Sequence, residues 1–157
     1  MIRIVVVDDH HVVRQGLRGF LETEPDFEIV GEAASGLEVG PLVEQLRPDV
    51  LIVDLLMPGV DGFEVTKQVA GQWPQTRVIV LSMYSNEASV QKAFASGAVG
   101  YALKDSTATE LSRGIREVMA MSFGCGSTCS RFAVESAGER PARFAAASDH
   151  LLSQAPL

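Results

Sequence analysis

The chain has 157 residues, of which 46% are hydrophobic and 21% are charged, a composition typical of one soluble globular domain with a short appendage. Its formal net charge of −7 argues against a protein that itself follows the phosphates of a nucleic acid. The N-terminus "MIRIVVVDDHH" turns acidic after an apolar run of about seven residues, too short for a signal-peptide core or a membrane span. We therefore expect a cytoplasmic protein.

The charge is unevenly distributed along the chain. Residues 1–120 hold 17 Asp and Glu against 10 Lys and Arg, which accounts for the whole −7, whereas residues 121–157 hold three of each. The second segment is rich in Ala and Ser and has few large aliphatic residues. These differences predict a folded domain over residues 1–120 and a linker or weakly ordered tail over residues 121–157.

The first segment alternates between strand patterns and helix patterns. In chain order it predicts a strand "IRIVVV", a helix with Val13 and Leu17 on its apolar face, a strand "FEIVGEA", a helix over residues 37–46, a strand "DVLIVD", a helix from Phe63 to a stop before Trp73, a strand "RVIVLS", a helix over residues 85–96, a strand "GYALK", and a last helix that Thr107 and Glu110 open as a capping box. Five strands alternating with five helices predict an α/β fold with a doubly wound parallel sheet of five strands.

The third predicted strand ends in a lone carboxylate, Asp54, after an otherwise apolar run. Burying that charge is costly unless something pairs with it. In a parallel α/β sheet the carboxyl ends of the strands meet at one edge, where binding sites form. We therefore expect Asp54 to lie near the polar residues that end or follow the other strands, which are Asp8, Asp9, Ser82 and Lys104.

Three converging carboxylates repel one another unless a cation lies between them. Oxygen ligands favour a hard divalent ion, and Mg²⁺ suits a site with one or two direct carboxylates. Such an ion could also bind a phosphoryl group, with Lys104 neutralising the remaining charge and Ser82 donating a hydrogen bond. Asp54 would then be free to act as a nucleophile and form an acyl phosphate.

Four motifs carry a resemblance to a known family. In order and spacing, "VVVDDHHVVRQGL", "DVLIVDLLMPGVDG", "VIVLSMY" and "GAVGYALKD" resemble the receiver domain of two-component response regulators. The Asp-His after the first strand and the tripeptide Leu103-Lys104-Asp105 resemble the NarL/FixJ (LuxR-type) subfamily. The resemblance implies a flavodoxin-like (βα)5 fold and a signalling switch, not an enzyme in the ordinary sense, that catalyses its own phosphorylation and dephosphorylation.

For the metal and the phosphoryl group, the resemblance implies specific roles at this edge. Asp54 would be the phosphoacceptor and a ligand of Mg²⁺. Asp9 would bind the ion directly, Asp8 mainly through water, and the backbone carbonyl of Leu56 would be a further ligand. Lys104 would contact the phosphoryl group.

The resemblance also implies a conformational switch and a control of its lifetime. Ser82 and Tyr101 would be the switch pair. Leu56 and Tyr84, two residues after Asp54 and Ser82, would line the path of the attacking water. One is apolar and the other bulky, and neither is a good water-orienting base, so we expect slow self-dephosphorylation.

Several motifs also have simpler interpretations. Asp8-Asp9 alone would equally fit the start of a helix, since Asp is a favoured cap. A zinc site through His10 and His11 is disfavoured because adjacent residues rarely face one ion, so both are expected at an exposed helix start. Cys125 and Cys129 lack a second Cys/His pair and are expected to be free thiols.

Two other functions compete with the signalling switch. A phosphatase of the haloacid dehalogenase type also uses an Asp nucleophile and Mg²⁺, but it needs a second Asp two residues later, where this chain has Leu56. A flavodoxin-like cofactor binder would need a Ser/Thr/Gly-rich phosphate loop after the first strand, where this chain has "DDHHVV".

The expected partners follow from the resemblance. A sensor histidine kinase would supply the phosphoryl group, phosphorylation would favour a homodimer, and no membrane contact is expected. NarL/FixJ regulators resemble one another in a C-terminal helix-turn-helix, which would begin with an L-(S/T)-x-R-E-like stretch that this sequence lacks. DNA binding is therefore expected only through an output domain absent from this chain, in a parent transcriptional regulator. The alternative is a single-domain receiver that acts through protein–protein contacts.

The tail itself is not expected to bind DNA specifically. Its three arginines are balanced by three acidic residues, and it lacks two helices with apolar faces. The apolar residues Phe144, Leu151 and Leu152 could instead dock on the folded domain or on a second subunit.

Overall fold

The computed structural model describes residues 1–84, 86–120 and 144–146. The expectations for Cys125, Cys129, Leu151 and Leu152, and for most of the tail, lie outside the described residues. Within them, the elements in chain order are β1 (Ile2–Val7), α1 (His11–Leu21), β2 (Phe27–Ala33), a short 3₁₀ helix η1 (Gly36–Glu38), α2 (Val39–Leu46), β3 (Val50–Asp54), α3 (Gly62–Gln72), β4 (Arg77–Ser82), α4 (Glu87–Ala95), β5 (Gly100–Leu103), α5 (Ala108–Ala120) and β6 (Phe144–Ala146).

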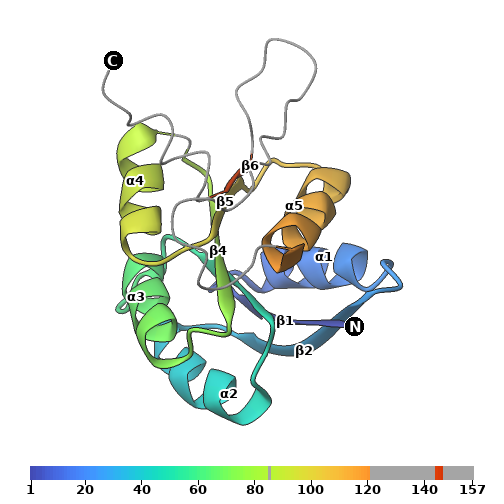
Figure 1. The fold of residues 1–157 in the computed structure, drawn as a ribbon, viewed down its shortest axis with the longest axis horizontal. Coiled ribbons are helices and arrows are strands. Elements are labelled where there is room, and N and C mark those ends of the chain that lie inside the picture. The colour runs from blue at the N-terminus through green and yellow to red at the C-terminus, as the bar shows by residue number, and fades with distance from the viewer. Residues whose placement is uncertain (85, 121–143, 147–157) are drawn as a thin grey trace.

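The five predicted strands form a parallel sheet in the order β2-β1-β3-β4-β5, which confirms the doubly wound fold. Figure 1 shows α2, α3 and α4 on one side of the sheet and α1 and α5 on the other. Because the chain moves from β1 outward to β2 and then crosses back to β3, the strand order reverses between β1 and β3. Sites in such sheets lie at the carboxyl ends of the two strands that flank this reversal.

The sheet has a sixth strand that the sequence analysis did not predict. β6 comes from the segment interpreted as a linker, and it pairs antiparallel with β5, with Tyr101 opposite Ala145. Without β6, β5 would present a row of unpaired backbone groups at the sheet edge. A segment of three residues is too short to show the alternation that predicts a strand. Its pairing partner becomes evident only from the folded sheet, in which β5 would otherwise be the edge strand.

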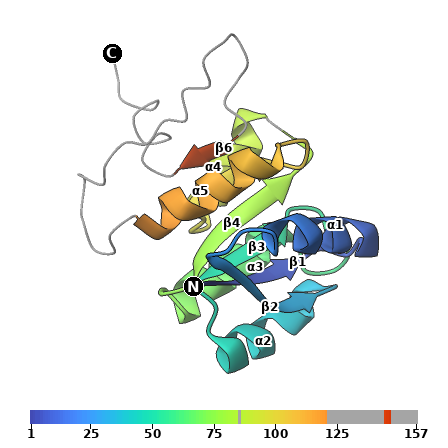
Figure 2. The ribbon, with the colours of Figure 1, turned by 90° about the vertical axis from the view of Figure 1, so that its right-hand side faces the viewer.

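Two apolar layers cover the sheet because successive side chains of each strand point to opposite faces. Ile4 and Val6 of β1 belong to the layer that includes α1 and α5, whereas Val5 and Val7 belong to the layer that includes α2, α3 and α4. Figure 2 shows α1 and α5 together, with α2 beyond the sheet. The four β1 side chains are no more than 1% exposed, as expected for parallel strands buried on both faces.

The helix boundaries follow local signals. Thr107 and Glu110 form the predicted capping box at α5, with Thr107 N donating to Glu110 Oε2 and Glu110 N donating to Thr107 Oγ1. The sequence predicts a helix start at Ser85, whereas α4 begins at Glu87 after the N-cap residue Asn86, whose side chain accepts a hydrogen bond from Ser89 N.

Among the described residues, no helix has both the length and the apolar character needed to cross a membrane.

Gly62 sets the distance between α3 and the end of β3. A Cβ at this position would lie 2.5 Å from the carbonyl oxygen of Asp54 and 2.8 Å from Cα of Leu55. Real Cβ atoms do not approach backbone that closely. Only glycine therefore allows α3 to begin directly against the strand end that carries Asp54.

The Gly62→Ala variant should be less stable by about 2 kcal/mol, because the added methyl forces the end of β3 away from α3. Gly16→Ala, in the exposed middle of α1 with nothing within 4 Å of the new methyl, should instead gain up to about 1 kcal/mol from helix propensity. Urea unfolding of both variants measures the difference. Equal stability changes in the two variants would contradict the close packing at Gly62.

Candidate functional site

Asp8 and Asp54 lie side by side at the carboxyl ends of β1 and β3. Val7 is the register partner of Val53, so the next residue on each strand stands at the same edge of the sheet. Asp8 is 1% exposed and Asp54 is 4% exposed. The prediction that these residues converge is confirmed, and the pairing of two adjacent parallel strands is its cause.

Lys104 supplies the positive charge between the two carboxylates. It follows β5, its backbone N–H donates to the carbonyl of Ser82 over 2.8 Å, and its long side chain reaches across the end of β4. The ammonium nitrogen lies 3.0 Å from Asp8 Oδ2 and 3.2 Å from Asp54 Oδ1. One lysine thus contacts both carboxylates in a largely buried position.

The electrostatics of the site are unbalanced despite this lysine. Burial raises the pKa of the Asp54 carboxyl above its ordinary value, the charge of Asp8 raises it further, and Lys104 offsets only part of the effect. Burial lowers the pKa of Lys104, but its contacts with Asp8 and Asp54 outweigh burial, and the resulting pKa is raised. In the folded protein, two carboxylates whose charges repel each other therefore lie beside one lysine that stays protonated.

The donor set at this edge fits a divalent cation. Asp8, Asp9, His10 and Asp54 each offer one ligand atom, and these atoms all lie within 4.8 Å of one another. Asp8 Oδ2 and Asp9 Oδ1 are buried and accept no well-directed hydrogen bond. Lys104 Nζ lies 3.0 Å from the first of these oxygens, and His10 Nδ1 lies 3.0 Å from the second. Buried carboxylate oxygens with unused acceptor capacity favour an oxygen-preferring ion such as Mg²⁺.

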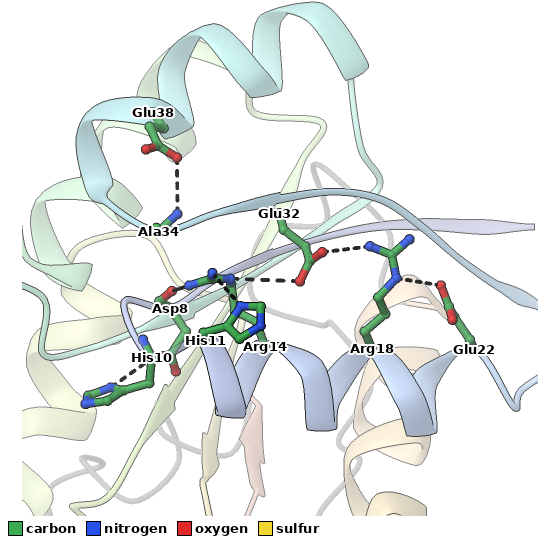
Figure 3. A network of polar contacts seen from close by, with 9 residues as sticks. All are labelled: Asp8, His10, His11, Arg14, Arg18, Glu22, Glu32, Ala34 and Glu38. Atoms are coloured by element: carbon green, nitrogen blue, oxygen red, sulfur yellow. Dashed lines mark hydrogen bonds and ion pairs between the residues drawn. The ribbon is translucent and has the colours of Figure 1, made fainter.

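His10 is part of this donor set, which the sequence analysis did not anticipate. Its predicted place at the exposed start of a helix is confirmed, since it is the N-cap residue of α1 and its side chain is 66% exposed. Its imidazole nevertheless lies 3.3 Å from Asp8 Oδ1 and 3.0 Å from Asp9 Oδ1. The expectation that the two adjacent histidines do not face one ion holds, because the His11 ring lies against Arg14 (Figure 3) and only His10 faces the carboxylates.

Ser82 and Tyr101 lie behind the carboxylates, on β4 and β5. Ser82 is 1% exposed and its hydroxyl oxygen accepts a hydrogen bond from Tyr84 N over 3.0 Å. The Tyr101 ring is buried, and its hydroxyl donates to the backbone carbonyl of Tyr84 over 2.6 Å. Burial raises the pKa of Tyr101, and a hydrogen bond with Ser82 opposes that rise. The two residues therefore meet at the loop that follows β4.

Leu56 and Tyr84 lie at the rim of the site. Their side chains are 55% and 49% exposed. The backbone N–H of Leu56 points at Asp54 Oδ1 across 3.4 Å, which places the loop after β3 over the carboxylate. The position of Leu56 fits its predicted place beside Asp54, and neither side chain offers a base to the solvent-facing side of the site.

Arg14 and Arg18 connect the site to α1 and β2. Arg14 donates to the backbone carbonyl of Asp8 over 2.5 Å and lies 3.9 Å from Glu32 Oε1. Arg18 pairs with Glu32 at 2.7 Å and with Glu22 at 2.9 Å. Figure 3 shows the two arginines of α1 reaching toward the same Glu32 on β2. This network fixes the loop that carries Asp8 and was not evident from sequence, because it pairs residues of different elements.

Comparison with known proteins agrees with this geometry. Residues 4–116 match the family model of the response regulator receiver domain. The chain is 47% identical over 110 residues to the uncharacterized transcriptional regulatory protein YhcZ of Bacillus subtilis, covering 70% of this chain and 51% of that one. It is 43% identical over 116 residues to the transcriptional regulatory protein LiaR of the same organism, covering 74% and 55%.

A solved structure extends the comparison to the fold. The crystal structure of a LuxR-family two-component response regulator from Aurantimonas superposes with a TM-score of 0.72 at 36% identity, covering 75% of this chain and 84% of that one. The chain spans about half the length of the two curated relatives it matches. By its fold, its acidic site and these matches, this chain belongs to the response regulator receiver domain family, with NarL/LuxR-type regulators among its relatives.

Proposed function

We propose that this chain is a phosphorylation-controlled switch in which Asp54 accepts a phosphoryl group from the phosphohistidine of a sensor kinase. The observation that carries the proposal is the contact of one largely buried lysine, Lys104, with both Asp8 and Asp54. The negative charge of Asp54 is only partly neutralised, and the ammonium group of Lys104 is held beside it. A carboxylate in this position is suited to attack an electrophilic phosphorus.

The chemistry assigns a task to each residue. A carboxylate oxygen of Asp54 attacks phosphorus, the phosphorus–nitrogen bond to the kinase histidine breaks, and the nitrogen keeps the electron pair. Asp8 and Asp9 would hold Mg²⁺ together with Asp54 and the Leu56 carbonyl, and the bound ion would neutralise charge on the transferred group. Lys104 would hold a phosphoryl oxygen after transfer, because its ammonium group already lies within contact distance of Asp54.

The switch itself would involve Ser82 and Tyr101. Ser82 ends β4, and its hydroxyl would donate a hydrogen bond to a phosphoryl group on Asp54. Doing so would change the Ser82–Tyr84 contact and, through the Tyr84 carbonyl, the position of Tyr101. The outcome we propose is a conformational state that favours homodimerisation of a parent transcriptional regulator, with DNA contacted only through an output domain. A single-domain receiver that acts through protein contacts is the alternative.

A phosphatase of the haloacid dehalogenase type is less well supported. The position of its general acid is taken here by Leu56, an exposed aliphatic side chain that cannot transfer a proton.

Phosphorylation by acetyl phosphate with Mg²⁺ should require Asp54. Asp54→Asn removes the nucleophile and should abolish the phosphate-sized mass increase in intact-protein mass spectrometry. Asp61→Asn is a matched control, because Asp61 only caps α3 by accepting from Glu64 N and Asn also caps helices. Persistent labelling of the Asp54 variant on another residue would contradict the assignment.

Without Mg²⁺, Asp54→Asn should be more stable than the parent protein near pH 7. The raised pKa of Asp54 means that the folded state resists ionisation of this carboxyl. Stability is therefore lost as the pH rises through the folded-state pKa, and is fully retained below the ordinary carboxyl pKa of about 3.9. Urea unfolding in EDTA, at about pH 7 and about pH 4, measures the gap between the two proteins. A gap that does not shrink at the lower pH would refute its electrostatic origin.

The acyl phosphate on Asp54 should be long-lived, and Leu56→Asn should shorten its lifetime by about tenfold, since an amide can orient the attacking water. Leu37→Asn changes an equally apolar, exposed side chain on η1 and should leave the lifetime unchanged. Decay of the phosphorylated mass after removal of the donor measures both. An unchanged decay in the Leu56 variant would remove this explanation.

A further inference from the structure

His10 occupies a helix-capping position without acting as a cap. It is the N-cap of α1, where a side chain ordinarily bonds a free backbone N–H of the first turn. The His10 side chain makes no such hydrogen bond. Its backbone N–H donates instead to Asp8 Oδ1 over 2.8 Å, and Figure 3 shows its imidazole beside Asp8, away from His11 and Arg14. The side chain is therefore available to the acidic site.

The spacing of the donor atoms suits a shared ion. His10 Nδ1 lies 3.0 Å from Asp9 Oδ1 and 3.3 Å from Asp8 Oδ1. In an octahedral shell with bonds of about 2.1 Å, neighbouring ligand atoms are about 3.0 Å apart. Asp54 completes a set whose atoms lie within 4.8 Å of one another. An imidazole at this spacing from two carboxylates has the arrangement of a ligand in a mixed nitrogen–oxygen site.

The chemistry of the donor set determines which ions gain from it. Mg²⁺ prefers oxygen ligands and keeps several waters, so an imidazole nitrogen adds little to its affinity. Imidazole suits Ni²⁺ and Zn²⁺ in particular, and among first-row transition metals the affinity for a nitrogen–oxygen site rises from Mn²⁺, the weakest, through Co²⁺ to Ni²⁺. We propose that His10 is a nitrogen ligand of this site and gives it a His10-dependent preference for divalent transition metals over Mg²⁺.

This inference rests on the proposed metal site at Asp8, Asp9 and Asp54, and it adds a residue and a class of ion to it. Lys104 faces the site from β5, on Asp8 Oδ2 and Asp54 Oδ1. His10 faces it from α1, on Asp8 Oδ1 and Asp9 Oδ1. The two nitrogen-bearing groups therefore contact different carboxylate oxygens, and an ion held near His10 need not displace the lysine.

The test compares Mn²⁺ and Mg²⁺ binding to the full chain at about pH 8, where an imidazole is ordinarily neutral. The electron paramagnetic resonance signal of free Mn²⁺ gives its affinity, and displacement by Mg²⁺ gives the other. His10→Ala and His10→Gln should weaken Mn²⁺ binding about tenfold and Mg²⁺ binding less than about twofold. His11→Ala, next to it in sequence but turned toward Arg14, should change neither.

A second readout does not depend on affinity. Pulsed resonance of bound Mn²⁺ should detect a directly bonded nitrogen in the parent protein and in His11→Ala, and not in either His10 variant. An absent nitrogen coupling in the parent protein, or an equal loss of Mn²⁺ and Mg²⁺ affinity in the His10 variants, would overturn the inference while leaving the Mg²⁺ site intact. Failure of both ions to bind the parent protein would overturn the proposed metal site as well.

Discussion

Two carboxylates held beside each other in a buried position are the constraint on which the rest of this structure depends. Asp8 and Asp54 are almost fully excluded from solvent, and each repels the charge of the other. Lys104 reaches both of them but does not cancel the effect, since the pKa of Asp54 remains raised. The negative charge of the site is therefore only partly neutralised, and a divalent cation can neutralise the rest.

The fold brings the two carboxylates and Lys104 together at one edge of the sheet. Parallel pairing of β1 with β3 sets the two carboxylates next to each other, and the order of the strands brings Lys104 from two strands away. Gly62 lets α3 begin against the backbone of Asp54, so the loop that carries Leu56 lies over the carboxylate. The strand pairing and the close approach at Gly62 act through the backbone, which is stiffer than the side chains. They hold the carboxylates together although electrostatic repulsion alone would separate them.

The site is joined to the surface by two separate sets of contacts. Toward β5, Ser82 and Tyr101 both hydrogen-bond to the backbone of Tyr84, which links the Ser82 hydroxyl to a buried aromatic ring. Toward α1, Arg14 holds the carbonyl of Asp8 and shares Glu32 with Arg18. The first set supports the proposed switch, and the second restrains the loop from which Asp8, Asp9 and His10 project.

The sequence by itself determined the five parallel strands, the five helices and the meeting of Asp8, Asp54 and Lys104, because apolar periodicity identifies strands and parallel strands share one edge for their carboxyl ends. It also determined the capping box at Thr107, whose partners are three residues apart. Tertiary structure alone decided the direction of the His10 imidazole, the arginine network around Glu32, the pairing of β6 with β5 and the need for glycine at position 62. These depend on residues from different elements, and no local pattern records which side chains distant strands and helices will bring into contact.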